Sequence, residues 1–212
     1  ASEKEQDPTL RKRSFEFLVA AYGPDKMNDP SQQEPIVNRM IQLDPQDATN
    51  YFALAKIRED AGDYGKAEEV LLQAKQARPN DPQVYLQLAG FYNRQEEFEK
   101  TIDALNQRAA IEPNNPEAFY TISTYYWDKA YRDFRLKEPE KKEFVLKGIE
   151  QVDKALALKA DYMEALTYKN LLLRLQANLE KDTAKQSALL KEADNLRDQA
   201  LALQKKQAAG IK

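Results

Sequence analysis

Three prolines recur at a fixed interval along the chain. Pro45, Pro79 and Pro113 lie 34 residues apart, and each closes a similar segment: Leu-Asp-Pro, Ala-Arg-Pro and Ile-Glu-Pro. Proline disfavours helical geometry in the residue before it, so each segment is predicted to end a helix. The segments 80–82 and 114–116 then supply an Asp or Asn N-cap followed by proline at the first helical position, where its missing N–H costs nothing. The repeat therefore predicts a series of helix pairs, one for every 34 residues.

Large and small side chains follow the same period. Small residues let two helices approach closely, and large residues fill the space beside them. In the unit 48–81 these positions hold Tyr51, Leu54, Ala55, Gly62, Tyr64, Ala67, Leu71 and Ala74. The unit 82–115 repeats the pattern with Tyr85, Leu88, Ala89, Tyr92, Phe98 and Leu105, and departs from it at Glu96, Thr101 and Arg108.

Five units are predicted within a single domain spanning 1–212, at about 14–47, 48–81, 82–115, 116–160 and 161–207. In the first unit, Gly23-Pro24 ends the first helix early, and Pro30 and Pro35 predict a short or kinked second helix. In the fourth unit the closing apolar segment arrives 13 residues late. This insertion predicts lengthened helices, 116 to about 134 and 139–158. The fifth unit is also long, with a second helix predicted from Thr183 to about Gln207.

From about Ser14 to Gln207 the chain resembles the tetratricopeptide-repeat (TPR) superfamily. Both the 34-residue register and the residues that begin and end the helices agree with that family over two full units. The resemblance implies an all-α fold, a right-handed superhelical solenoid of about five helix-turn-helix repeats with the last two elongated. The segments 20–26 and 90–95 are also similar to a group of TPR proteins common in acidobacteria, whose members look exported.

The resemblance also implies where a partner would bind. In TPR arrays the first helix of each pair lines the concave groove, mainly through positions 2, 5, 9, 12 and 13 of each unit. The groove candidates in this sequence are Phe52, Lys56, Leu86, Asn93, Arg94, Tyr120, Thr124, Trp127 and Arg174. Trp127 fits the groove and the core equally well, and Lys56 and Arg94 can also be read as solvated charges. Tyr126 is assigned to the core, and Tyr131 and Phe134 are expected to pack under the insertion.

The composition excludes several kinds of chemistry. There is no cysteine and no histidine, so Cys nucleophiles, His general bases, disulfides and the usual zinc sites are absent. Catalysis by two acids, for example Glu117 with Asp128, would need an environment that raises one pKa, and nothing in the sequence demands it. Asp25, Asn28 and Asp29 lack the spacing of a calcium loop, and Asp29 is predicted to cap a helix before Pro30. No catalytic residue, metal site or cofactor is predicted.

The predicted function is a non-catalytic protein–protein interaction scaffold or adaptor that binds a peptide segment or a helix of a partner protein. The net charge of −3 gives no basic footprint for nucleic acid, and no apolar run approaches the ~20 residues of a membrane span. The groove lacks the Lys/Asn/Arg set that clamps acidic chaperone tails, since Phe52 and Gln87 stand at two of its positions. The alternative is a self-associating subunit, a dimer or filament built by stacking of solenoid ends.

The cellular location is predicted from weaker signals. Absence of cysteine suits an oxidising compartment, where a free thiol would be a liability. The first residues, Ala1-Ser2-Glu3, are of the small kind that follows signal-peptide cleavage. We therefore expect an exported protein, periplasmic or extracellular, with the cytoplasm as the alternative.

Overall fold

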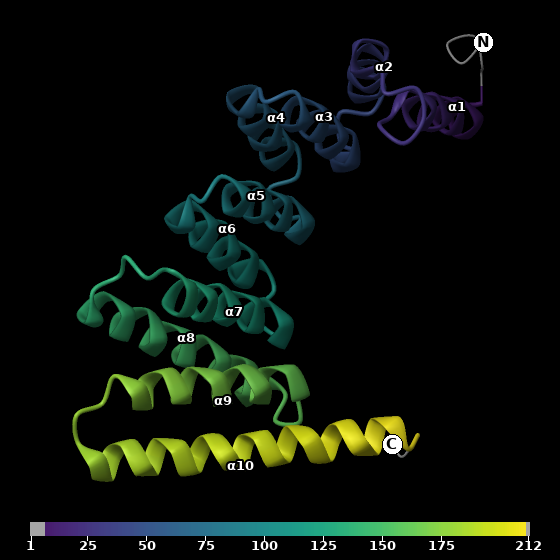
Figure 1. Cartoon of the computed structure of the whole chain (residues 1–212). Coiled ribbons are helices and arrows are strands. Elements are labelled where there is room, and N and C mark those ends of the chain that lie inside the picture. Colours follow the sequence, from purple (N-terminus) through teal and green to yellow (C-terminus); the bar gives the residue numbers. More distant parts are fainter. Residues whose placement is uncertain (1–6, 211–212) are drawn as a thin grey trace. The chain divides into compact units, whose positions relative to one another are not determined.

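The computed structural model describes residues 7–210, and within that range the chain forms ten α-helices and no strand (Figure 1). Consecutive helices make up five pairs, which confirms the predicted all-α repeat fold. The helices are α1 (Pro8–Tyr22), α2 (Pro30–Leu43), α3 (Ala48–Asp60), α4 (Tyr64–Ala77), α5 (Pro82–Arg94), α6 (Phe98–Ile111), α7 (Pro116–Arg132), α8 (Glu138–Leu158), α9 (Met163–Asn178) and α10 (Thr183–Ala208).

The helices begin where the cap signals predict. Asp81 accepts a hydrogen bond from the backbone N–H of Gln83, and Asn115 accepts one from Glu117, each directly before a proline. Asp29 likewise caps α2 through the N–H of Gln32, as expected. These side chains satisfy donors that a helix start leaves without an intrahelical partner.

The first pair departs from the predicted frame at its start. α1 begins at Pro8, ahead of Ser14, because Asp7 caps it and accepts hydrogen bonds from the N–H groups of Thr9 and Leu10. α2 runs for 14 residues, the same length as α4, and continues through Pro35. Of the two alternatives, a short or a kinked α2, the short helix was therefore wrong, and the kink stays a prediction. Pro30 occupies the first helical position, and Pro35 removes a single intrahelical hydrogen bond.

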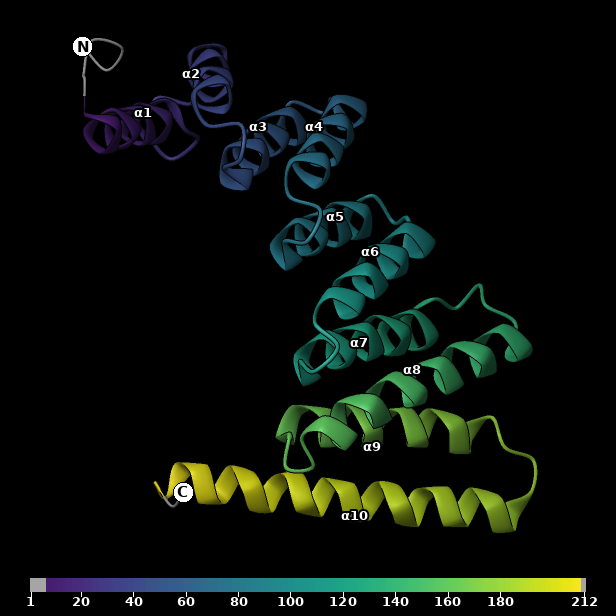
Figure 2. The same ribbon diagram turned by 180° about the vertical axis from the view of Figure 1, so that it is seen from behind.

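Two compact units divide the chain, Ala1–Ala104 and Leu105–Lys212, with the boundary inside α6. In the first unit α1 packs on α2, α2 on α3, α3 on α4 and α4 on α5. In the second unit α7 packs on α8, α8 on α9 and α9 on α10, and α7 also contacts α9 (Figures 1 and 2). Within residues 7–210, none of the helices has the length and apolar character needed to cross a bilayer.

Small residues mark the close helix contacts of the first unit. Ala55, Ala67, Ala74 and Ala89 are all buried, as the repeat register predicts. The large residues beside them, Tyr51, Leu54, Leu71 and Tyr85, are buried too. The hydroxyls of Tyr51 and Tyr85 donate to the carbonyl oxygens of Pro45 and Pro79, so these two core tyrosines tie each first helix to the turn before it.

The turns inside the second and third pairs use the same backbone conformation with different residues. Gly62 has φ +77° between α3 and α4, and Glu96 has φ +60° between α5 and α6. An L-residue in this left-handed region costs about 1–2 kcal/mol. Glycine avoids that cost, which is why the repeat pattern favours glycine here and why Glu96 is a strained departure from it.

Replacing Glu96 with glycine is therefore expected to raise the free energy of unfolding by about 0.5–1 kcal/mol, after allowing for the greater freedom of glycine in the unfolded chain. The exposed Glu96 side chain makes no hydrogen bond or ion pair with another residue in the range 7–210, so its removal costs no contact. Urea unfolding followed by circular dichroism measures the change. Gly62→Ala is the matched reverse variant and should lower stability, since a Cβ at Gly62 meets no atom within 4 Å and only the backbone conformation is tested.

Candidate protein-binding surface

In the second unit, α7 and α9 are the first helices of two successive pairs. Each of them carries a row of side chains along one face, which we call its stripe. On α7 the stripe is Tyr120, Thr124, Trp127 and Tyr131, and on α9 it is Glu164, Tyr168, Leu171 and Leu175. Both follow the spacing of three or four residues that places side chains on one helix face. None of the eight is fully buried, although α7 and α9 contact one another.

Five aromatic rings from these two helices and from the N-cap of α9 form a connected cluster, which we call the aromatic surface: Tyr120, Trp127, Tyr131, Tyr162 and Tyr168. The ring centroid of Tyr120 lies 5.2 Å from that of Tyr162 and 5.4 Å from that of Tyr168. Trp127 lies 5.6 Å from Tyr168, edge to face, and stacks on Tyr131 at 4.9 Å. These separations lie in the range at which aromatic pairs attract one another beyond simple burial.

The apolar bodies of these rings are anchored on the core. Tyr120, Trp127 and Tyr162 pack against a fully buried cluster of Val152, Ala155, Ala165 and Leu172 from α8 and α9. The rings are therefore held in fixed positions by rigid helices while remaining partly exposed.

The polar tips of the aromatic surface differ from those of the core tyrosines. The hydroxyls of Tyr51, Tyr85 and Tyr92 each donate to a carbonyl or carboxylate oxygen. By contrast, the hydroxyls of Tyr120, Tyr162 and Tyr168 and the indole N–H of Trp127 have no hydrogen-bond partner among the described residues. Tyrosine and tryptophan with a packed body and an unpaired polar tip are the form in which these residues are enriched at interfaces.

The electrostatic environment of the surface is negative near Tyr120. Burial, reinforced by Tyr168, Tyr162 and the Glu164 carboxylate, raises the pKa of Tyr120 to about 12. Burial also raises the pKa of Tyr162, with Glu164 and Glu117 acting in the same direction. Both tyrosines therefore stay neutral, and their hydroxyls can donate as well as accept hydrogen bonds.

The expectation that Tyr131 and Phe134 pack under the insertion was wrong. Tyr131 is 60% exposed and Phe134 is 91% exposed. α7 ends at Arg132, so Phe134 lies in the short connection before α8, next to Asp133, which caps α7 and receives hydrogen bonds from Lys129 and Arg135. Tyr126, in contrast, is buried as predicted.

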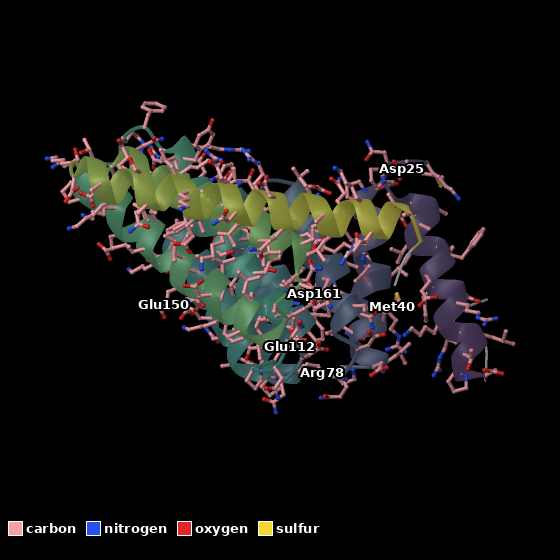
Figure 3. All side chains as sticks on the ribbon, turned by 90° about the horizontal axis from the view of Figure 1, so that it is seen from below. Asp25, Met40, Arg78, Glu112, Glu150 and Asp161 are labelled. Atoms are coloured by element: carbon pink, nitrogen blue, oxygen red, sulfur yellow. The ribbon has the colours of Figure 1, made fainter. Side chains whose placement is uncertain are left out.

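In the first unit, Phe52 borders an open cavity of about 560 Å³ at the start of α3 and α5. We call it the first-unit pocket. Among the described residues that line it, Phe52 is the single aromatic one. The other lining residues are mainly polar and include Asp47, Arg78 (labelled in Figure 3), Asp81, Gln83 and Gln87. The predicted groove residue thus faces a real depression in the surface.

The remaining first-unit candidates lie on α3 and α5 at exposed or partly exposed positions. Arg94 makes a bidentate ion pair with Glu59, at 2.6 and 2.9 Å, and so links α5 to α3. Lys56 pairs with Asp60 one turn along the same helix. Leu86 is partly buried and Asn93 is exposed.

The other two second-unit candidates have different surroundings. Thr124 lies between Tyr120 and Trp127 on the stripe of α7, and its hydroxyl donates to the carbonyl oxygen of Thr121 at 2.7 Å. Arg174 is held against the second helix of its pair, because its guanidinium contacts Asn170 at 2.9 Å and Asp194 of α10 at 2.6 Å. Arg174 therefore connects α9 to α10.

Three members of the aromatic surface were absent from the groove candidates: Tyr131, which was expected to pack under the insertion, Tyr162 and Tyr168. Tyr162 precedes α9 as its N-cap residue, and Tyr168 does not stand at one of the five groove positions. A helical-spacing argument would have found Tyr168, since it lies four residues after Glu164 and three before Leu171, on the same face of α9. Tyr162 carried no such signal, because the path of the turn before α9 decides where it points.

Comparison with known proteins extends these observations. Residues 60–123 match a family model described as tetratricopeptide repeat. No curated protein matches the chain in sequence. The acidobacterial grouping stays a prediction.

Solved structures match along nearly the whole chain. The MamA protein is 17% identical over 93% of each chain, with a TM-score of 0.58. YrrB, described as a TPR protein with an unusual peptide-binding site, is 14% identical over 96% of this chain and 94% of its own, with a TM-score of 0.54. A tetratricopeptide repeat protein from Parabacteroides merdae is 16% identical over 94% of this chain and 77% of its own, with a TM-score of 0.56. At these identities the likeness shows the fold. Residues 60–123 are therefore similar to the tetratricopeptide repeat, and the described helices share the fold of these solved repeat proteins.

Proposed function

We propose that the chain is a non-catalytic protein-interaction scaffold, and that a peptide segment or helix of a partner protein binds across α7 and α9. The observation that carries this proposal is the aromatic surface. Its rings pack on the buried cluster of α8 and α9, while the hydroxyls of Tyr120, Tyr162 and Tyr168 have no hydrogen-bond partner among the described residues. Tyr, Trp and Arg are the residue types that most often dominate protein–protein binding energy. Binding of peptides to YrrB, which has the same fold, supports the proposal as a precedent.

The first-unit pocket is a second candidate binding site, within the first unit alone. Phe52 supplies an apolar wall, and the side chains of Gln83 and Gln87 can donate to and accept from a peptide backbone. The apolar wall can contact one anchoring side chain of a partner, while the polar lining can form hydrogen bonds to the backbone of that partner.

Site-specific photocrosslinking tests the proposal directly. A photoreactive phenylalanine analogue placed at Thr124 or at Phe52 in the otherwise intact protein is expected to capture a protein partner in an extract of the source organism. The same analogue at Tyr64, an exposed aromatic on α4, is the matched control and is expected to capture little. Equal capture from Tyr64 and Thr124, or none from Thr124 and Phe52, would contradict the proposal.

Self-association is the second candidate function, and one observation favours it. Leu10 and Phe17 are 48% and 71% exposed and lie seven residues apart, on one face of α1. An uncovered apolar helix face at the end of a repeat array can bind a second copy. Light scattering over a wide concentration range, with Phe17→Asp as the comparison, decides the question. A mass that stays that of one chain at every concentration removes this candidate.

We also propose that the protein acts outside the cytoplasm, on the absence of cysteine. Fractionation of the source cells, with immunodetection of the chain, tests this directly.

A further inference from the structure

Carboxylates flank the aromatic surface at its Tyr120 end. Glu164, in the first turn of α9, is exposed and makes no ion pair with another residue of the range 7–210. Asp161, in the turn before α9 and labelled in Figure 3, is also exposed and makes none. Glu117 begins α7 and is 58% exposed at its side chain. Glu164 acts on both Tyr120 and Tyr162, Glu117 acts on Tyr162, and Asp161 directly precedes Tyr162 in the sequence.

The nearby cations of the chain contact other groups and leave Glu164 without an ion pair in the range 7–210. Arg108 is buried and already binds Glu112 at 2.8 Å and Glu117 at 3.3 Å. Lys159 lies over the Tyr162 ring, 5.0 Å from its centroid, which shows that this ring can take a cation on its face. Neither cation pairs with Glu164.

The faces of aromatic rings attract cations, and a carboxylate beside them adds a charge partner. Here Tyr120 has two other tyrosine rings within 5.4 Å of its centroid, and the three hydroxyls have no partner among the described residues. Arginine fits such a site better than lysine does. Its guanidinium is planar and can stack on a ring, it carries five donors for hydroxyl and carboxylate oxygens, and it is more weakly hydrated than an ammonium group.

We propose that the Tyr120 end of the aromatic surface binds an arginine side chain of the partner protein, with its guanidinium against the tyrosine rings and paired with Glu164. This inference rests on the proposed function and adds the chemistry by which the partner is recognised. The favoured partner segment carries an arginine followed by an apolar side chain for Trp127, Leu171 and Leu175. Charge complementarity with Glu164 and Asp161, neither of which has an ion-pair partner in the range 7–210, selects against an acidic segment.

The chain contains one tryptophan, so its fluorescence reports on this surface alone. Trp127 contacts Tyr168, which contacts Tyr120, so occupation of the site should alter its emission. The probe is the capped tripeptide acetyl-Ala-Arg-Ala-amide, titrated into the intact protein. The comparison peptide replaces arginine with citrulline, which has nearly the same shape and no charge.

A saturable change in emission is expected with the arginine peptide, and binding of the citrulline peptide is expected to be weaker by about tenfold or more. Glu164→Gln should weaken binding of the arginine peptide severalfold and leave the affinity for the citrulline peptide unchanged. Glu150→Gln, on α8 outside the surface and labelled in Figure 3, is the matched control and should change neither. Added salt should weaken binding of the arginine peptide more than binding of the citrulline peptide, because salt screens the attraction between charges.

Three results would overturn the inference: no saturable change up to the solubility limit of the arginine peptide, equal binding of the two peptides, or an unchanged affinity in Glu164→Gln. The crosslinking experiment separates this failure from failure of the proposed function. Capture of a partner at Thr124 with no preference for arginine leaves the scaffold role in place and removes the arginine site. Arginine binding with no captured partner would keep the arginine site and remove the scaffold role.

Discussion

Replacement of Leu172 by alanine is expected to lower the free energy of unfolding by about 2–5 kcal/mol. Leu172 lies in α9, is fully buried, and packs with Val152 and Ala155 of α8. Gly148 of α8 has no side chain, and the methyl groups of Leu172 fill the space beside it: a Cβ at Gly148 would lie 2.8 Å from Cδ2 of Leu172. Truncation therefore removes buried apolar surface and leaves a cavity between two packed helices. Urea unfolding followed by circular dichroism measures the loss.

Leu201→Ala is the matched control for this prediction. Leu201 lies on α10 and is 45% exposed, so the same truncation there should stay within about 0.5 kcal/mol. Equal effects at the two positions would show that α8 and α9 do not pack as described.

The contact between Gly148 and Leu172 can be tested from both sides. In the wild-type protein, Gly148→Ala brings a Cβ against Leu172 and to 3.2 Å from Cβ of Tyr126. Such overpacking costs about 1–3 kcal/mol, of which the better helix propensity of alanine offsets about 1. In the Leu172→Ala protein the closest contact is gone, so Gly148→Ala should be harmless or stabilising. We expect a coupling energy of about 0.5–3 kcal/mol, and additive effects would contradict the packing.

Helix positions were predictable because they depend on local chemistry. Asp81-Pro82 and Asn115-Pro116 start helices through a side-chain cap and a proline, and both signals act within a few residues. The start of α1 was missed although Asp7-Pro8 is the same signal, since it lies outside the 34-residue frame. The conformation of Phe134 could not be predicted in this way, because the connection after α7 depends on Asp133 receiving hydrogen bonds from Lys129 and Arg135.

The candidate surface was predictable only in outline. Position in the repeat placed Phe52, Tyr120 and Trp127 on first helices, and all three prove to be partly exposed. Position could not show that Tyr120 and Trp127 also pack on the core cluster around Leu172, because that contact depends on the distance between α7 and α9. Position in the repeat also could not distinguish a tyrosine whose hydroxyl makes a hydrogen bond, such as Tyr85, from a tyrosine whose hydroxyl makes none. Both properties follow from the packed structure.

Trp127→Ala is expected to weaken binding of a partner captured at Thr124 by about 30-fold or more, which corresponds to ~2 kcal/mol. Trp127 joins the two halves of the aromatic surface, since it stacks on Tyr131 and meets Tyr168 edge to face. Truncation removes this contact area together with an indole N–H that is available to a partner. Calorimetric titration with the purified partner gives the change in affinity.

Stability must be measured beside affinity, because Trp127 also packs against the buried cluster of α8 and α9. The titration is therefore run at a temperature where circular dichroism shows the variant fully folded. Trp127→Phe, which keeps an apolar ring without the N–H, is expected to fall between wild type and Trp127→Ala. Tyr64→Ala removes an exposed aromatic from α4 and should change the affinity by no more than about twofold.

Wild-type affinity in a folded Trp127→Ala protein would contradict the placement of the partner on α7 and α9. Phe52→Ala then becomes the deciding variant, since Phe52 borders the first-unit pocket on a separate pair of first helices. A loss of binding there alone would assign the partner to the pocket. Losses at both positions would mean that one partner contacts both units, because truncation of an aromatic outside an interface does not reach about 2 kcal/mol of binding energy.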